Sequence, residues 1–477
     1  LTIANVSVLT IAGGLAVTPT QGTWVITSYA VAEAITVPLT GWFTQRYGSV
    51  RVFVIAMAAF GLCSALAGMS SSLGFLVFAR VLQGMAGGPL MPLSQTLLLR
   101  IFPKEKAGAA TGIWAMTTLV GPVLGPILGG WICDNYTWPW IFLINLPIAA
   151  ACAWICWKIL RSYETRIVRN PIDMVGFALL IIWVGALQIM LDEGKNLDWF
   201  SSNIIIALAI TAVIGFAAFM IWELTAEHPI VDLRVFRHRG FSAAVLTISL
   251  TFAGFFAANV LTPLWLQSFM SYTATDAGMT TAWIGIMAFL TAPAVAGMSM
   301  KMDPRKLVFV GVLWLGLMTL YRTVATTDMT YWDVALPLML LGLGMPFFFI
   351  PSTAAALASV DEAETNSAAG LMNFMRTLSG AIATSMVTSY WEDEISRNRA
   401  ELVGVIDPAQ ITYNQLIAQG MPDAQATVVL ERMVTEQSVM LATNELMLVV
   451  ALILIFSAFV IWLVPKPTRT IDPSAAH

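Results

Sequence analysis

Charged side chains are scarce in this chain: Asp, Glu, Lys and Arg make up 11% of its 477 residues, whereas a soluble domain carries about 25%. Hydrophobic residues make up 58% and are spread over the whole length. No single buried core could hold them, so lipid must solvate the chain. The formal net charge of −4 offers no basic surface, which argues against a nucleic-acid partner.

Cysteine and histidine are also rare, with four and three residues respectively. Cys63, Cys133, Cys152 and Cys156 lie in or beside apolar segments without metal-ligand spacing, so we interpret them as packing residues and expect no disulfide and no metal site. The histidines lie in a polar loop or at the last position, which excludes a histidine proton relay at membrane depth.

The sequence lacks clustered catalytic groups at membrane depth, a phosphate-binding P-loop and a sizeable ligand-binding domain. These absences disfavour a membrane-embedded enzyme, an ATP-driven pump and a receptor. We therefore expect a transporter without a cofactor.

Long apolar runs are abundant. Fourteen segments of roughly 18–25 residues are each long enough for a transmembrane helix. They lie near 1–17, 22–43, 52–70, 74–99, 107–132, 140–160, 174–191, 203–222, 241–268, 277–300, 307–325, 334–356, 366–390 and 440–464. The chain opens inside the first segment, which we expect to be truncated. We predict an all-α polytopic membrane protein with fourteen transmembrane helices.

Lysine and arginine are distributed unevenly among the connections between these segments. If the N-terminus is cytoplasmic, seventeen of the 24 lie in cytoplasmic connections or the C-terminal tail, and five lie on the opposite side. Two, Arg80 and Arg376, fall inside expected helices. This bias follows the positive-inside rule, so we expect both termini in the cytoplasm. The acidic connection at 360–365 departs from the pattern, but acidic residues contribute little to the rule.

One connection, 391–439, is far longer than the few residues usual between helices. It is polar and is expected on the outer side of the membrane. Pro422 and Asp423 resemble a helix start, and the apolar positions after them follow a helical period. The segment is either an outward extension of the last helix or a solvated loop. In either form it could dock a partner protein or act as a lid over the outer mouth of a cavity.

Glycine and proline are concentrated in GIWAMTTLVGPVLGPILGG at 112–130, although both are poor residues for a helix interior. Gly121, Gly125 and Gly129 are four residues apart and share one helix face, which lets another helix approach backbone to backbone. Packing alone could explain the pattern. Its full spacing, however, is a complete match to the helix-five antiporter motif of the major facilitator superfamily, carried here by Gly112, Gly121, Gly125, Pro126, Gly129 and Gly130.

Other stretches resemble the same superfamily. GWFTQRYGSVR at 41–51 resembles its loop between helices two and three; Gly41, Arg46, Gly48 and Arg51 match, and Gln45 replaces the usual acidic residue. That replacement puts the charge relay of this loop in doubt. RVLQGMAGG at 80–88 resembles its helix-four motif, and TIANVSV at 2–8 and NFMRTLSGAIATS at 373–385 resemble the fourteen-helix drug/proton antiporters.

Over nearly its whole length the chain resembles the EmrB-like multidrug efflux pumps of that group, as in TQGTWVITSYAVAEAITVPLTGW and LQIMLDEGKNLDWFSS. The resemblance implies two six-helix bundles at 1–160 and 241–464, two inserted helices within 161–240 and a cytoplasmic tail at 465–477. It implies proton-driven export of amphipathic toxic compounds across a bacterial inner membrane. It also implies an EmrA-like periplasmic adaptor and a TolC-like outer-membrane channel. Export of an endogenous metabolite, or uptake, remains an alternative.

Glu33 is the one acidic residue, of 28, near the middle of an expected helix. An acidic side chain at this depth costs about 2.5–3.5 kcal/mol on insertion scales and marks a functional site by default. We expect Glu33 to handle the coupling proton or cationic substrates. The alternatives are a carboxylate that only faces a water-filled cavity and a coupling role for an aspartate that the resemblance places before Leu1.

Arg80 and Arg376 are expected to assist proton coupling. A buried guanidinium cannot be deprotonated and must find a partner. We expect Arg80 to favour proton release from a nearby carboxylate; a structural anchor for backbone carbonyls is the alternative. The same hypothesis applies to Arg376.

The chain carries 25 Met, 25 Phe and 17 Trp. Adaptable Met and broad aromatic faces suit a promiscuous site for flat amphipathic compounds. The residues that we expect to line a central substrate cavity are Asn5, Gln95, Trp114, Asn259, Asn373 and Phe374.

Overall fold

The computed structural model of the chain describes residues 2–102, 117, 120–165, 167, 171–227, 229–299, 302–361, 364–404, 413–418 and 420–465. Every regular element in these residues is a helix. The expected all-α fold is therefore confirmed for the described part of the chain.

The helices before the inserted pair are α1 (Thr2–Gly14), α2 (Pro19–Thr36), α3 (Thr40–Tyr47), α4 (Ser49–Gly68), α5 (Leu73–Gly87), α6 (Leu90–Ile101), α8 (Val120–Asn135), α9 (Trp140–Leu143) and α10 (Asn145–Leu160). The inserted pair is α11 (Met174–Glu193) and α12 (Asn203–Thr225). The helices after it are α13 (Arg239–Phe269), α14 (Ala274–Ser299), α15 (Pro304–Tyr321), α16 (Tyr331–Ala358), α17 (Thr365–Gly404) and α19 (Asp423–Val460).

Each of the fourteen expected apolar segments overlaps a helix of this list, and the segment near 107–132 lies partly outside the described residues. Within the described residues, ten helical stretches are long and apolar enough to cross a membrane. Three expected spans are interrupted; the one near 140–160 divides into α9 and α10 at Ile144, three residues before Pro147. The segment near 22–43 divides into α2 and α3 beside Pro38, and the one near 74–99 divides into α5 and α6 at Gly88 and Pro89. Proline removes a backbone donor, which explains breaks at these positions.

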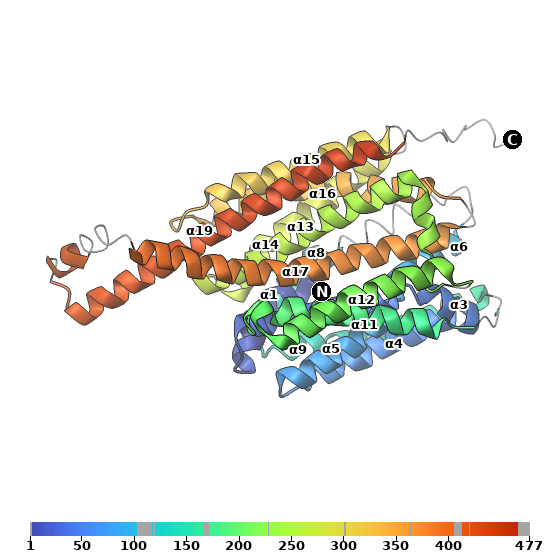
Figure 1. Cartoon of the computed structure of the whole chain (residues 1–477), viewed down its shortest axis with the longest axis horizontal. Coiled ribbons are helices and arrows are strands. Elements are labelled where there is room, and N and C mark those ends of the chain that lie inside the picture. Colours follow the sequence, from blue (N-terminus) through green and yellow to red (C-terminus); the bar gives the residue numbers. More distant parts are fainter. Residues whose placement is uncertain are drawn as a thin grey trace.

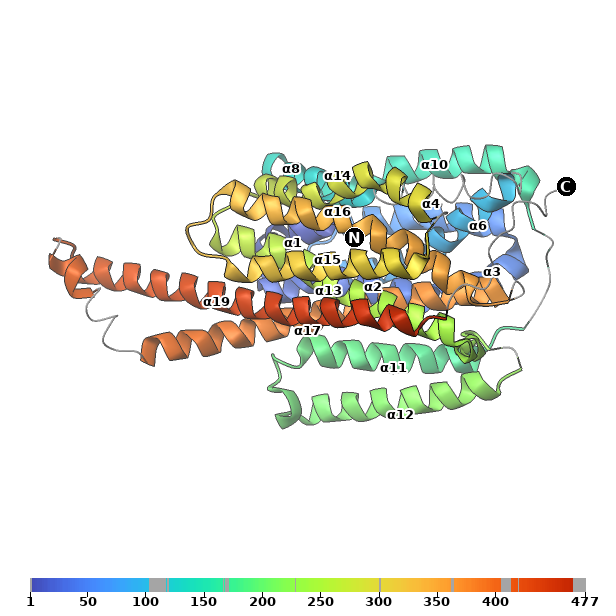
Figure 2. The ribbon, with the colours of Figure 1, turned by 90° about the horizontal axis from the view of Figure 1, so that it is seen from above.

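The helices run side by side in an elongated bundle (Figures 1 and 2). The helices before and after the inserted pair contact one another at several places, most extensively where α8 packs on α14, α2 on α17 and α1 on α13. The α11–α12 hairpin lies along the outside of the bundle, where α11 contacts both α2 and α17 (Figure 2). Through α11, the inserted pair therefore touches both halves of the protein.

In its described residues, 391–404, 413–418 and 420–439, the long polar connection is mostly helical. Helix α17 continues through 391–404, beyond its expected end at 390, and α19 begins at Asp423 with Pro422 as its N-cap. Both helices project beyond the rest of the bundle (Figure 1), at what we call the extension end. The helical alternative is thus correct for residues 423–439. The expected end of α17 is wrong because Glu, Arg and Ala in EDEISRNRAEL favour a helix even outside the apolar run.

Candidate functional site

Three charged side chains meet around α2. Glu33 lies on α2, Arg80 on α5 and Arg376 on α17, and Glu33 interacts electrostatically with both guanidinium groups. Among the described residues no cation lies within salt-bridge distance of Glu33. Because α5 belongs to the N-terminal half and α17 to the C-terminal half, the carboxylate interacts with positive charges from both halves.

Arg80 is held almost entirely by neutral partners. Its side chain is 4% exposed; Nε donates to the carbonyl oxygen of Val25 at 2.8 Å, and Nη1 donates to Oε1 of Gln83 at 2.5 Å. The guanidinium carbon lies 4.2 Å from the ring centroid of Tyr29. Nη2 is buried without a partner in the described residues. The carbonyl contact matches the anchoring alternative, while Nη2 is a donor that the described residues leave without an acceptor.

Arg376 resembles Arg80 in its surroundings. Its guanidinium carbon lies 5.2 Å from the ring centroid of Phe252 and 5.6 Å from that of Phe349, and its Nε is buried without a partner in the described part of the chain. A buried donor without an acceptor costs about 1–3 kcal/mol. Each of the two arginines that interact electrostatically with Glu33 thus has one unsatisfied donor in the described residues.

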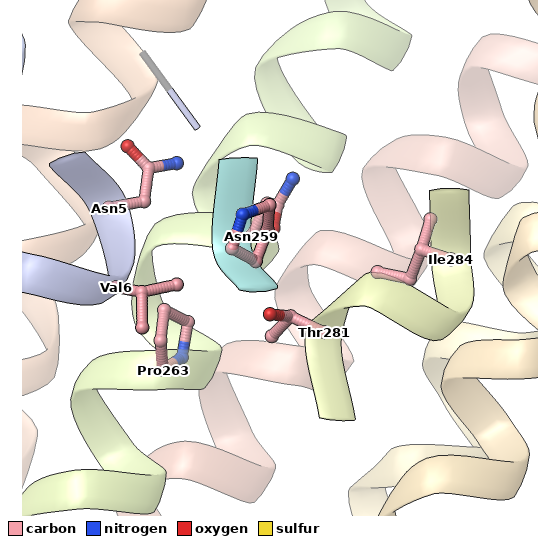
Figure 3. A pocket seen from close by; sticks show the side chains of 7 residues that line it. Asn5, Val6, Asn259, Pro263, Thr281 and Ile284 are labelled. Carbon is pink, nitrogen blue, oxygen red and sulfur yellow. The ribbon is translucent and has the colours of Figure 1, made fainter. Parts of the chain in front are cut away.

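A small pocket lies between the two halves (Figure 3). Asn5 and Val6 of α1 and Pro126 of α8 form one side, and α13 and α14 form the other through Asn259, Pro263, Thr281 and Ile284. Oδ1 of Asn5 is buried without a partner in the described residues. The volume of about 10 Å³ suits about one water molecule. A drug-sized molecule can bind here only if the halves separate.

The other expected cavity residues lie elsewhere. Gln95 is half-buried on α6. Asn373 is 6% exposed and donates to the carbonyl oxygen of Ala369 in its own helix at 2.9 Å, and Phe374 belongs to the hydrophobic core. Trp114 and Gly112 lie outside the described residues. The structure therefore brings together only Asn5 and Asn259 of the expected set.

Two glycines of the antiporter motif bring α8 against both halves. A Cβ at Gly129 would lie 2.6 Å from the carbonyl oxygen of Ile3 on α1, and one at Gly130 would overlap the carbonyl of Ala274 on α14. On α14, Gly278 packs in the same way against the carbonyl of Pro126. A Cβ at Gly121 would meet nothing within 4 Å. The close backbone approach expected of the motif thus occurs at 129 and 130.

The loop motif contains a tight turn between α3 and α4. Gly48 has φ of +91° and lies where a Cβ would overlap the carboxylate of Glu164. That carboxylate accepts from the amides of Val50 and Arg51 at 3.0 and 3.1 Å and so caps α4. Glu164 thus supplies a negative charge beside a motif in which Gln45 replaces the usual acidic residue. Gly41 and Arg46 lie on α3, where Arg46 stacks over Trp42 at 5.5 Å from its ring centroid.

Asp192, near the end of α11, is a half-buried carboxylate that the sequence analysis missed. Its Oδ2 accepts from Oγ1 of Thr27 on α2 at 3.1 Å, and its Oδ1 accepts from Nε2 of Gln188 at 3.2 Å. Gln188 also donates to Ser385 on α17. The hydropathy pattern places the end of the apolar segment at residue 191, so the sequence predicts that Asp192 lies in a loop. The amide side chain of Gln188, one helical turn earlier, was the sequence signal that Asp192 continues the helix and pairs with it.

The comparisons with known proteins agree with this geometry. The Major Facilitator Superfamily pattern matches residues 1–384. Two solved transporters of the POT family, one with a thioalcohol-conjugated peptide and one with 5-aminolevulinic acid, share the fold at TM-scores of 0.65 and 0.66. The first is 13% identical to this chain, and the match covers 96% of this chain and 93% of that transporter. The second is 14% identical, and the match covers 98% of this chain and 93% of that transporter. The chain belongs to the Major Facilitator Superfamily and is a multi-pass membrane transporter, not an enzyme.

Within the superfamily the chain is similar to multidrug exporters over its whole length. It is 42% identical to the multidrug export protein EmrB of Haemophilus influenzae, over 98% of this chain and 93% of that protein. It is 42% identical to EmrB of Escherichia coli, over 98% of this chain and 92% of that protein. It is also 41% identical to the fatty acid resistance protein FarB of Neisseria gonorrhoeae, over 98% and 93%. The family resemblance read from the motifs is thus confirmed.

Proposed function

We propose that this transporter is a proton-coupled exporter of amphipathic toxic compounds in a bacterial inner membrane. The observation that carries the proposal is Glu33, a carboxylate on α2 that interacts electrostatically with Arg80 of one half and Arg376 of the other. The whole-length similarity to proteins named for multidrug export supports the direction of transport.

The coupling step follows from the position of Glu33 between the halves. When α17 lies against α2, both guanidinium groups favour the ionised carboxylate, and the proton is released. When the halves part, Arg376 moves away with α17, and Glu33 keeps only the positive charge of Arg80, which favours the protonated form relative to the closed arrangement with two positive charges. One proton is thus taken up and released in each cycle of alternating access. No protein-bound cofactor is required.

The substrate site forms at the pocket between the halves. Asn5 and Asn259 offer amide groups from opposite halves, so one compound can contact both only at one stage of the cycle. Apolar walls around a few amides suit compounds with an apolar body and one or two polar groups. The name of the FarB relative favours fatty acids as one substrate class.

A partner assembly completes the export path. The extension of α17 and α19 carries mixed charges and is too polar for lipid (Figure 2). We place the contact with an EmrA-like periplasmic adaptor on this extension, with a TolC-like channel beyond it. This assignment puts the extension end in the periplasm and both termini in the cytoplasm, as the distribution of Lys and Arg favours.

Reconstitution of the purified chain in vesicles tests the function. A panel of neutral, cationic and fatty-acid compounds is followed with and without an imposed proton gradient. Gradient-dependent movement of several compounds is expected, and Asn5→Ala combined with Asn259→Ala should change the profile compound by compound. Movement of one metabolite only, or none of the panel, would favour the alternative of metabolite transport. A uniform loss in the double variant would indicate misfolding.

A further inference from the structure

The α11–α12 hairpin holds a fully buried carboxylate at its end away from the extension (Figure 2). This residue is Glu223, near the end of α12, which is 0% exposed. Its Oε2 accepts from the backbone N–H of Val231 at 3.0 Å, but its Oε1 is buried with no hydrogen-bond partner among the described residues. Buried polar atoms nearly always have a partner, and a buried carboxylate needs a compensating charge if it is ionised. Oε1 is therefore a position at which a small ligand would bind.

A second carboxylate borders the same position. Asp173 is the N-cap of α11 and is half-buried. A Cβ at Gly176 would lie 2.4 Å from Oδ2 of Asp173 and 2.4 Å from Oε1 of Glu223, so these two oxygens flank one small space. The other oxygen of Asp173, Oδ1, accepts from the Gly176 amide and from the Trp222 indole N–H, each at 2.9 Å. Each carboxylate is thus held by its own donors, and Oε1 of one lies beside Oδ2 of the other.

The charges that act on Glu223 are negative. Asp173 and Asp232 both interact with it electrostatically, and Asp232 precedes the short helix η4 (Leu233–Arg237) in the connection to α13. Arg234, two residues after Asp232, donates instead to the carbonyl oxygen of Ala226 at 2.9 Å. Among the described residues no Lys, Arg or His forms an ion pair with Glu223. Two carboxylates that share a site cannot both stay ionised without a large cost. The site therefore favours uptake of one positive charge.

A proton fits this site better than a metal ion. Metal ions in proteins take four or more ligands, and Asp173 and Glu223 offer two carboxylates. In the described part of the chain, the one group of three or more His, Cys, Asp or Glu side chains with metal-ligand spacing lies elsewhere, at His238, Asp361 and Glu364. A larger cation could not enter, because Glu223 is fully buried. A proton needs one donor oxygen and one acceptor oxygen, which this pair provides.

We propose that Glu223 and Asp173 form a proton-binding site, in which Oε1 of Glu223 carries one proton and donates a hydrogen bond to Oδ2 of Asp173. The proton comes from water, and its binding forms one O–H bond and one hydrogen bond. It ties the start of α11 to the end of α12 and, through the Val231 amide, to the connection that leads to α13. Release of the proton leaves two negative charges side by side and loosens this end of the hairpin. The site is separate from Glu33 and does not depend on proton coupling there.

Infrared spectroscopy of the full chain, in a detergent without carbonyl groups, tests the site. A protonated carboxyl group has a C=O stretch that a carboxylate lacks. At about pH 7 an ordinary glutamate, with a pKa of about 4.3, is ionised and does not contribute to this band. Glu223→Gln keeps the shape of the side chain and should remove one carboxyl group per chain from the band. Asp173→Asn offers an amide donor to Oε1 of Glu223, so Glu223 should ionise at this pH and regain its proton only at lower pH.

Glu227→Gln is the matched control, because Glu227 lies four residues further along the chain and is exposed; it should leave the band unchanged. A band as strong as that of the wild-type protein in both Glu223→Gln and Asp173→Asn would show that Glu223 is ionised, and would overturn the proposal. Thermal unfolding distinguishes a metal ion from a proton. A midpoint that rises in NaCl relative to choline chloride at equal ionic strength, in the wild-type protein but not in Glu223→Gln, would assign the site to sodium and would also overturn it.

Discussion

At the scale of single residues, a few buried polar groups destabilise the fold because they lack hydrogen-bond partners. Arg80, Arg376 and Asn5 each have a buried atom without a partner in the described residues. Such atoms cost about 1–3 kcal/mol each, and a bundle selected for stability alone would satisfy them. Asn5 lines the pocket between the halves, and Arg376 lies on α17, which packs against α2, so we expect these two residues to gain partners at another stage of the transport cycle.

Arg80 can be tested by separating its charge from its geometry. Arg80→Lys keeps the charge and loses the fork that reaches both Val25 and Gln83. We expect it to retain transport with a shifted pH dependence. Arg80→Ala should lower transport in vesicles about tenfold, the equivalent of one charged hydrogen bond of about 1.5 kcal/mol. Arg397→Ala, on an exposed side chain, is the control. Wild-type rates in Arg80→Ala would rule out a coupling role.

Asp192 should contribute to stability. Asp192→Ala leaves the donors of Thr27 and Gln188 without their acceptor, so we expect a loss of about 1–3 kcal/mol in the free energy of unfolding. Asp192→Asn retains an acceptor oxygen and should recover part of the loss. Thermal unfolding in detergent measures both, with Asp328→Ala in an exposed connection as the control. Equal midpoints for Asp192→Ala and the control would show that the network contributes no stability.

At the scale of helices, glycine determines how closely α8 approaches its neighbours. Gly130→Ala would place a Cβ onto the carbonyl of Ala274, and we expect a destabilisation of about 1–3 kcal/mol from overpacking. Gly297→Ala is the matched control, because a Cβ there meets nothing within 4 Å. Unfolding midpoints that do not differ between the two variants would contradict the role of the motif in close packing.

The extension of α17 and α19 can be shortened without disturbing its base. Replacing residues 400–430 by a short Gly/Ser linker leaves the Arg399–Glu431 ion pair, 2.9 Å long, in place. Adaptor docking predicts that cells lose drug resistance while the isolated protein still transports in vesicles. If the extension is a lid instead, vesicle transport itself changes. A shortened protein that still captures its adaptor and still confers resistance would contradict docking.

At the scale of the whole molecule, apolar runs predict most of the fold. Each expected segment overlaps a helix because length and hydropathy decide membrane insertion. The contacts between distant segments could not be predicted. Glu164 caps α4 from more than a hundred residues away, and Asp192 joins α11 to α2. Hydropathy describes the lipid exposure of a segment and contains no information about which helix lies beside it.

The candidate site was predictable where chemistry alone identifies a residue. Glu33 and Arg80 are conspicuous as charges within apolar runs, and their proximity around α2 agrees with the hypothesis of a coupled cluster. For Phe374 and Asn373, the prediction of a place in the cavity rests only on the helix that carries them. In the structure Phe374 packs into the hydrophobic core, and Asn373 donates to the backbone of its own helix, α17. Helix rotation depends on neighbours that one sequence does not reveal.

Proton flux measured with a pH-sensitive dye inside vesicles tests the coupling role of Glu33 most directly. Addition of an exported compound to the wild-type protein should drive protons in the direction opposite to the compound. Glu33→Gln, which cannot ionise, should abolish this compound-dependent flux, whereas Glu401→Gln, on an exposed side chain of the extension, should keep it. Unchanged proton flux in Glu33→Gln with both neutral and cationic compounds would contradict proton coupling through Glu33.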